Sequence, residues 1–149
     1  PIKNIGASGA KMMSETIDLA HAHIKFENGA VANLKSSRIA QNYIRKIKTY
    51  QKNLYSITDL MIPQTELYGL ENNNKFSSDA KTQLIKTQSG EKTLYYEKFI
   101  PKNNDALLEE INDFVRSINL RSNPIVDGQA GLNALKIALE IENKIFLNE

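Results

Sequence analysis

Residues 17–39 read IDLAHAHIKFENGAVANLKSSRI, and this stretch decides the fold of the chain. Two runs of alternating side chains flank residues 27–29, and Asn-Gly between such runs is a strong short-range signal of a β-hairpin. A two-residue loop would pair Phe26 with Val31 and mix polar and apolar side chains on both faces. A three-residue loop with its glycine in the left-handed conformation pairs Phe26 with Ala30 and separates the two kinds. We therefore expect the three-residue loop.

This register gives the hairpin one apolar face and one polar face. The apolar face suits packing against helices and carries Ala20, Ala22, Ile24, Phe26, Ala30, Ala32, Leu34 and Ser36. The other face is polar but includes apolar side chains, so we expect it to be an oligomer interface rather than a purely solvated surface. The residues expected at that interface are Leu19, His21, His23, Val31 and Asn33.

The rest of the chain continues with strands and ends with helices. Alternating runs predict strands at 45–50, 54–61 and 65–70, a polar loop at 71–75, and a second hairpin from 83–87 and 92–100. Apolar residues then recur at helical spacing from Leu107 to Ile118, with Asn104 or Asp105 as the cap, and Asp127 suits the N-cap of a second helix. This order indicates an α+β fold: a mostly antiparallel, open-faced sheet with helices on one face and the other face available for oligomerisation.

Composition excludes several classes of protein. A chain of 149 residues suits one domain, and its net charge of +2 is too small to indicate binding to nucleic acid. The absence of cysteine excludes disulfides and thiolate metal sites and is compatible with a cytoplasmic protein. No apolar run approaches the roughly 20 residues that span a membrane, so we expect no membrane partner.

Two glycines near the start invite comparison with a phosphate-binding loop. The dinucleotide fingerprint needs three spaced glycines between a strand and a helix. Here Gly6 and Gly9 follow a short possible strand at 2–5 and lead towards another strand. We expect residues 6–10 to form a plain connection without cofactor binding.

His21 and His23 are the only histidines, and they point to the same side of a strand. This geometry could hold a metal, but no sequence cluster supplies further ligands, so we expect interface imidazoles and no metal site. Arg38 at the end of the hairpin has two interpretations. It can form a salt bridge or cap, or its planar guanidinium can contact a sugar hydroxyl, phosphate or carboxylate of a substrate. The basic run from Arg45 to Lys52 is typical of a solvated strand, with an anion contact as the alternative.

A resemblance to a known family rests on two patterns. The hairpin reads D-L-A-x-A-x-I-x-F-x-N-G-x-V-A-N-L-x-x-S-R from Asp18 to Arg38, and V-D-G-x-x-G-L-x-A-L begins at Val126. With the basic strand and the Tyr-Ser-Ile strand between them, they resemble the C-terminal domain of Gfo/Idh/MocA oxidoreductases. The resemblance covers about Ile17 to Ile145. It implies that residues 1–149 are a single C-terminal substrate and oligomerisation domain, whose N-terminal Rossmann domain is absent from this chain.

The resemblance also implies a function for the parent protein. Such enzymes transfer a hydride between NAD or NADP and a hydroxyl of a sugar, nucleotide sugar or cyclitol. In them this domain supplies a wall of the substrate pocket, where Arg38 is the candidate contact, and the homo-oligomer interface. The family's Glu-Lys-Pro lysine and its acid/base helix residue have no counterpart here, so no catalytic residue is assigned and no cofactor is expected for this chain alone. The alternative is a non-catalytic α+β dimerisation or binding module.

Overall fold

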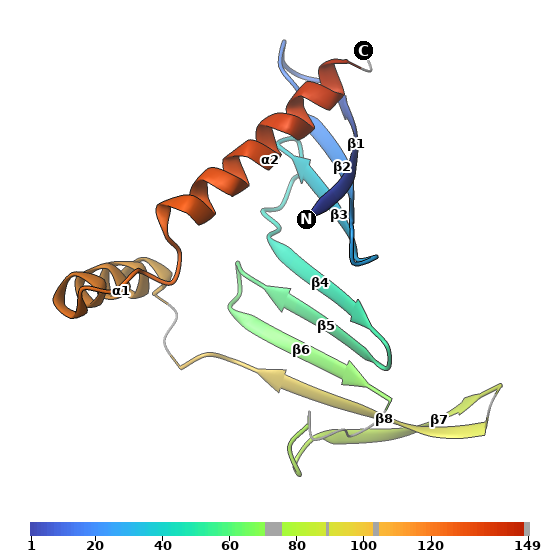
Figure 1. Ribbon diagram of the computed structural model, residues 1–149. Coiled ribbons are helices and arrows are strands. Elements are labelled where there is room, and N and C mark those ends of the chain that lie inside the picture. Colours follow the sequence, from blue (N-terminus) through green and yellow to red (C-terminus); the bar gives the residue numbers. More distant parts are fainter. Residues whose placement is uncertain (71–75, 89, 103–104, 148–149) are drawn as a thin grey trace. The chain divides into compact units, whose positions relative to one another are not determined.

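The computed structural model describes residues 1–70, 76–88, 90–102 and 105–147. The chain divides into two compact units, one of residues 1–41 with 107–149 and one of residues 42–106. Antiparallel strands and two helices confirm the expected α+β class, although the described strands fall into two open sheets (Figure 1). The expected polar loop at 71–75 and Asn104 as a helix cap lie outside the described residues.

The first unit contains the three-stranded sheet β1 (Ile2–Ala10), β2 (Leu19–Phe26) and β3 (Val31–Ser37), in that order. The expected hairpin register is confirmed. Lys25 lies opposite Val31, and the backbone N–H of Phe26 donates to the carbonyl of Ala30 at 2.9 Å. Gly29 has φ +85°, the left-handed conformation that the three-residue loop requires.

Strand β1 is longer than expected. Residues 6–10 do not form a connection, because they pair with β2 from Gly6 opposite His23 to Ala10 opposite Leu19. Gly9 lies on the face that α2 (Gly128–Phe146) covers: a Cβ atom there would stand 2.7 Å from Cγ2 of Ile145. Gly9, which looked like part of a loop, therefore allows the helix to approach the strand closely.

Packing of α2 on β1 forms the core of this unit (Figure 1). The buried apolar residues are Ile5, Ala22, Ile24 and Ile145. Leu34 belongs to the same apolar face but lies on β3, away from β1, and is 48% exposed. Asp127 caps α2 as expected, since its side chain accepts the N–H of Ala130 at 2.8 Å.

The amphipathic helix α1 (Ala106–Leu120) precedes α2 and matches the predicted one. Asp113 fixes the connection between the two helices by accepting the N–H of Ile125 at 2.8 Å and pairing with Arg116. These contacts, the Ile125 bond first, lower the pKa of Asp113. In the described part of the chain, neither helix is long and apolar enough to cross a membrane.

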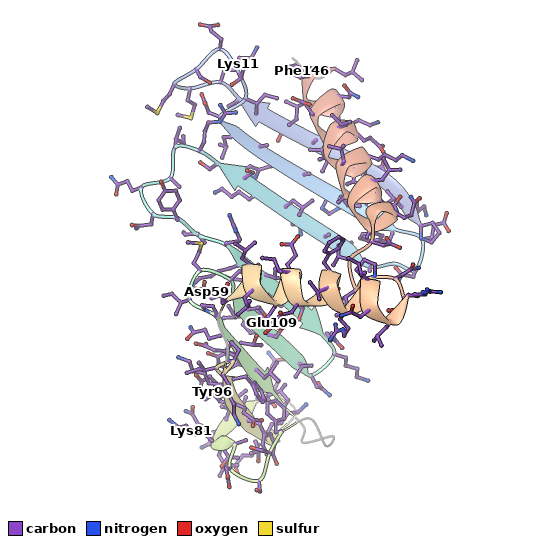
Figure 2. All side chains as sticks on the ribbon, turned by 90° about the vertical axis from the view of Figure 1, so that its left-hand side faces the viewer. Lys11, Asp59, Lys81, Tyr96, Glu109 and Phe146 are labelled. Atoms are coloured by element: carbon purple, nitrogen blue, oxygen red, sulfur yellow. The ribbon has the colours of Figure 1, made fainter. Side chains whose placement is uncertain are left out.

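The second unit is a five-stranded antiparallel sheet. Its strands are β4 (Lys46–Gln51), β5 (Leu54–Asp59), β6 (Gln64–Gly69), β7 (Lys81–Thr87) and β8 (Gly90–Phe99), in the order β4-β5-β6-β8-β7. The predicted second hairpin is the β7–β8 pair, in which Lys81 lies opposite Tyr96 (Figure 2). Phe76 is buried against Tyr95 on this sheet, with ring centroids 5.6 Å apart.

Candidate functional site

The polar face of the β1–β3 sheet, here called the outer face, gathers the residues expected at an interface. Register places Gly6 beside His23 and Ser8 beside His21, while Asn33 and Lys35 follow on β3. These residues line a shallow hollow of about 420 Å³. The hollow forms because Gly6 and Ser8, the neighbours of the two imidazoles on β1, are small and leave space beside the histidine rings.

Hydrogen bonding on the outer face is local. His23 Nδ1 lies 2.7 Å from Asn33 Oδ1, its neighbour across the strand pair. Val31 is 50% exposed on the same face. Leu19, His21, His23, Val31 and Asn33 thus share one surface of the described structure. No group of three His, Cys, Asp or Glu side chains among the described residues is placed to hold a metal ion.

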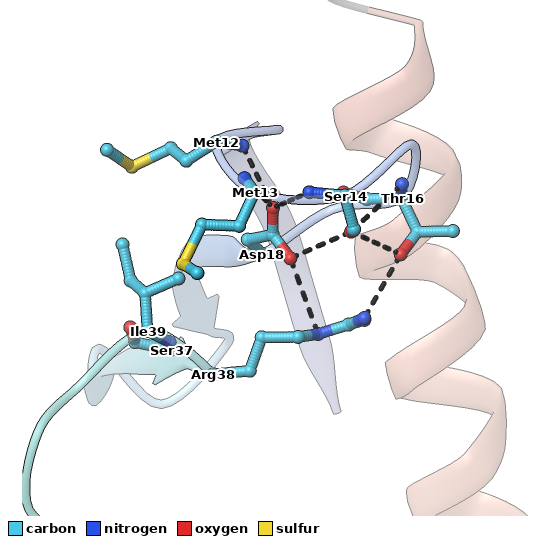
Figure 3. A network of polar contacts seen from close by, with 8 residues as sticks. All are labelled: Met12, Met13, Ser14, Thr16, Asp18, Ser37, Arg38 and Ile39. Carbon is cyan, nitrogen blue, oxygen red and sulfur yellow. Dashed lines mark hydrogen bonds and ion pairs between the residues drawn. The ribbon is translucent and has the colours of Figure 1, made fainter.

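A second polar cluster surrounds Asp18, in the loop between β1 and β2 (Figure 3). Oδ2 of Asp18 accepts backbone N–H bonds from Met12, Met13 and Ser14, at 2.9, 2.7 and 3.0 Å. Oδ1 accepts the hydroxyl of Ser14 at 2.8 Å. Asp18 is only 3% exposed, and the N–H bonds of Met13 and Met12 are the main reason that its pKa lies well below the ordinary value.

Arg38 joins this cluster from the end of β3. Its backbone N–H donates to the carbonyl of Asp18 at 3.0 Å, and its Nη1 donates to Oγ1 of Thr16 at 3.1 Å. The Nε atom lies 3.8 Å from Asp18 Oδ1, which is an ion pair but too long for a hydrogen bond. Arg38 therefore forms the salt bridge of the first interpretation. Its side chain is nevertheless 61% exposed, as the second interpretation, contact with a substrate, requires.

The sequence prediction missed the role of Asp18, which it treated as part of the strand. The available signal was an aspartate that follows the short polar run Ser14-Glu15-Thr16 directly before a strand. Aspartate in such a position commonly accepts N–H bonds from a neighbouring turn. Arg38 directly follows β3 of the outer-face sheet, and its described hydrogen bonds all go to the loop around Asp18.

The second unit carries a ladder of tyrosines. Tyr50, Tyr55, Tyr68 and Tyr96 lie opposite one another on β4, β5, β6 and β8. Successive ring centroids are 4.7, 5.7 and 5.0 Å apart. This spacing is typical of packed aromatic pairs. The hydroxyl of Tyr68 donates to Glu66 at 2.7 Å, which raises the pKa of Tyr68 to about 12.

Every residue of the basic strand β4 is exposed, and one of its lysines pairs with a buried carboxylate. Lys46 Nζ lies 3.0 Å from Asp59 Oδ2, and Asp59 is 5% exposed. Asp59 also accepts the N–H groups of Met61 and Ile62, and the Ile62 bond is the largest contribution to its lowered pKa. This cluster closes the turn after β5, and we assign no ligand to it.

Comparison with known proteins identifies the fold's relatives. No family model matches the chain. The sequence is 25% identical to UDP-N-acetylglucosamine 3-dehydrogenase from Acidithiobacillus ferrooxidans over 142 residues, which are 93% of this chain. The resemblance to a Gfo/Idh/MocA C-terminal domain is confirmed. The chain spans 40% of the length of that dehydrogenase.

Comparison with solved structures gives the same relative for the fold. The enzyme GnnA, the UDP-N-acetylglucosamine 3-dehydrogenase of the same organism, superposes with a TM-score of 0.76 at 23% identity. The match covers 97% of this chain and 40% of GnnA. A second crystal form of GnnA gives a TM-score of 0.75 with the same coverage. The two-sheet architecture is therefore shared with GnnA.

Proposed function

We propose that residues 1–149 are the single C-terminal substrate and oligomerisation domain of an NAD(P)-dependent dehydrogenase. The parent would transfer a hydride between the nicotinamide and a hydroxyl carbon of a nucleotide sugar. The observation that carries this proposal is the match along 93% of the chain to a dehydrogenase named for UDP-N-acetylglucosamine. The proposal includes a cytoplasmic location, with which the absence of cysteine is compatible.

The cofactor belongs to the other part of the parent in this proposal. Residues of β1 do not fit a dinucleotide, because Gly6 and Gly9 lie inside a strand paired along its length with β2. Backbone groups committed to a sheet do not form the cradle that a pyrophosphate needs at the start of a helix. We therefore assign NAD or NADP to an N-terminal nucleotide-binding domain and derive no chemical step from this chain.

Two surfaces would serve the parent. Arg38 would contact the substrate, since its guanidinium is exposed and its position is fixed by the loop around Asp18. The outer face, with Leu19, His21, His23, Val31 and Asn33, would form the homo-oligomer interface. An open sheet face with both apolar and polar side chains is a suitable surface for association.

The decisive experiment measures turnover by the native gene product that contains these residues. UDP-N-acetylglucosamine is added with NAD⁺ or NADP⁺, and formation of the reduced nicotinamide is followed by absorbance. We expect turnover from the native product and none from residues 1–149 alone. A native product without turnover and without an upstream G-x-G-x-x-G sequence would reject the enzyme and favour the non-catalytic binding module.

The interface is tested separately by sedimentation. Val31→Glu replaces an apolar side chain of the outer face with a charged one, and we expect it to shift the native product towards monomer because removing a charge from water opposes association. Leu84→Glu is the matched control, since Leu84 is 71% exposed on β7 in the second unit. An unchanged oligomer in the Val31 variant would remove the outer face from the interface.

A further inference from the structure

The carboxylate of Asp18 has its hydrogen bonds without Arg38. Three backbone N–H groups and one hydroxyl satisfy its two oxygens, and the group is almost fully buried. The guanidinium of Arg38 makes one hydrogen bond to Thr16 and a 3.8 Å ion pair with Asp18, and the side chain is 61% exposed. A guanidinium has five N–H donors, so most of them are available to a ligand.

We propose that Asp18 is a positioning residue for Arg38 and that Arg38 binds a phosphate group of the nucleotide-sugar substrate. This inference rests on the proposed function and adds to it the residue that orients the contact and the part of the substrate that is bound. Asp18 acts in two ways: it folds residues 12–14 around itself, and its charge draws Nε of Arg38 towards the loop.

The loop is built to hold the guanidinium in one direction (Figure 3). Ser14 bonds to Asp18, and its hydroxyl also lies 3.1 Å from Oγ1 of Thr16, which in turn accepts from Arg38. The chain of contacts therefore runs from the buried carboxylate to the exposed cation. A side chain held in this way loses less conformational freedom when a ligand binds, which favours affinity.

Phosphate is the ligand group that best matches this arrangement. Guanidinium forms charge-assisted, bidentate bonds to phosphate that are roughly twice as strong as bonds between neutral groups. The nearest carboxylate is already saturated and lies 3.8 Å from Nε, so it leaves the donors of Arg38 open. A sugar hydroxyl is neutral and would therefore form no ion pair with the Arg38 guanidinium that the loop holds.

The test compares UDP with uridine, which differ only by the diphosphate, using titrations of the native gene product. Arg38→Gln is expected to weaken UDP binding about tenfold or more, as for loss of a charged hydrogen bond, and to leave uridine binding unchanged. Arg121→Gln is the matched control, because it removes the same charge from an exposed position after α1. Asp18→Asn is expected to weaken UDP binding by a smaller factor.

The double variant separates positioning from general stability. If Asp18 acts through Arg38, Asp18→Asn adds no further loss in the Arg38→Gln background. Should Asp18→Asn fail to fold, Thr16→Val removes the acceptor of Nη1 while keeping the carboxylate bonds of Met12 and Met13, and it should also weaken UDP binding.

Three outcomes would overturn the inference while turnover of the native product still supports the dehydrogenase. The first is UDP affinity that is the same in Arg38→Gln and in the wild type. The second is equal loss of UDP and uridine binding in Asp18→Asn, which indicates a merely structural role. The third is an effect of Arg38→Gln on NADP⁺ binding alone, which assigns the phosphate to the cofactor. Absence of turnover would instead reject the proposed function.

Discussion

Gly9 provides a sharp test of the packing between α2 and β1. In Gly9→Ala the new Cβ would stand 2.7 Å from Cγ2 of Ile145, 3.0 Å from Cγ2 of Ile17 and 3.1 Å from the carbonyl oxygen of Leu19. Overpacking of a core costs about 1–3 kcal/mol. Alanine also restricts the unfolded chain more than glycine does, which offsets about 0.4–1 kcal/mol of this destabilisation. We therefore expect a net destabilisation of about 1–2 kcal/mol.

The molecule offers an independent spectroscopic signal for each unit. All six tyrosines lie between residues 43 and 96, in the second unit, whereas α2 and nearly all of α1 belong to the first. Thermal unfolding followed by helical circular dichroism therefore reports the first unit, and tyrosine fluorescence reports the second. For a unit of this size, Gly9→Ala should lower the helical midpoint by roughly 4–16 °C.

Gly6→Ala is the control in the same strand. No heavy atom lies within 4 Å of a Cβ built at Gly6, so this variant should match the wild type or exceed its stability slightly. Ile145→Leu, which removes the Cγ2 methyl at constant volume, should reduce the cost of Gly9→Ala. Equal helical midpoints for the alanine variants of Gly6 and Gly9 would refute the proposed close approach.

Three further predictions follow from particular contacts. Gly29→Ala should destabilise the first unit by about 1–2 kcal/mol in urea denaturation, because φ is +85° there; no loss would contradict the left-handed loop. Tyr68 should titrate near pH 12 in ultraviolet absorbance, and Glu66→Gln should lower this pKa by removing the carboxylate acceptor; an unchanged titration would reject that cause. Asp18→Asn should make stability less dependent on pH in acid. The ionised carboxylate stabilises the fold above its ordinary pKa of 3.8, and this contribution is lost as pH falls towards the lower pKa of the folded state. Unfolding free energies at neutral pH and at about pH 3 measure the difference, and parallel acid profiles of variant and wild type would count against it.

The hairpin could be predicted because its register depends on local information. A glycine two residues past Glu27 and the alternation on either side select a single pairing, and the observed contact between Phe26 and Ala30 agrees with it. The helices could also be predicted from the sequence, since apolar spacing from Leu107 onward and Asp127 as a cap are local signals.

Features that depend on contacts between residues far apart in the sequence were harder to predict. Gly9 lies in a strand because β2 pairs with it and Ile145 packs on it from 136 positions away in the sequence. The separation into two sheets also depends on which strands meet, and alternation within a strand does not encode this. For the candidate site, the sequence placed the outer-face residues together but missed the contacts of Asp18, whose hydrogen-bond donors come from the folded loop of residues 12–14.

The tyrosine ladder has a consequence for how this protein tolerates insertions and deletions. Successive side chains of a strand point to opposite faces, so shifting β5 or β6 by one residue would move its tyrosine out of the stack. Gain or loss of one codon within these strands would thus disrupt two ring contacts at once. The same change in the connection between β5 and β6, residues 60–63, would leave the stack in frame. Insertions and deletions among relatives should accordingly concentrate in the connections between these strands and avoid the strands that carry the tyrosines.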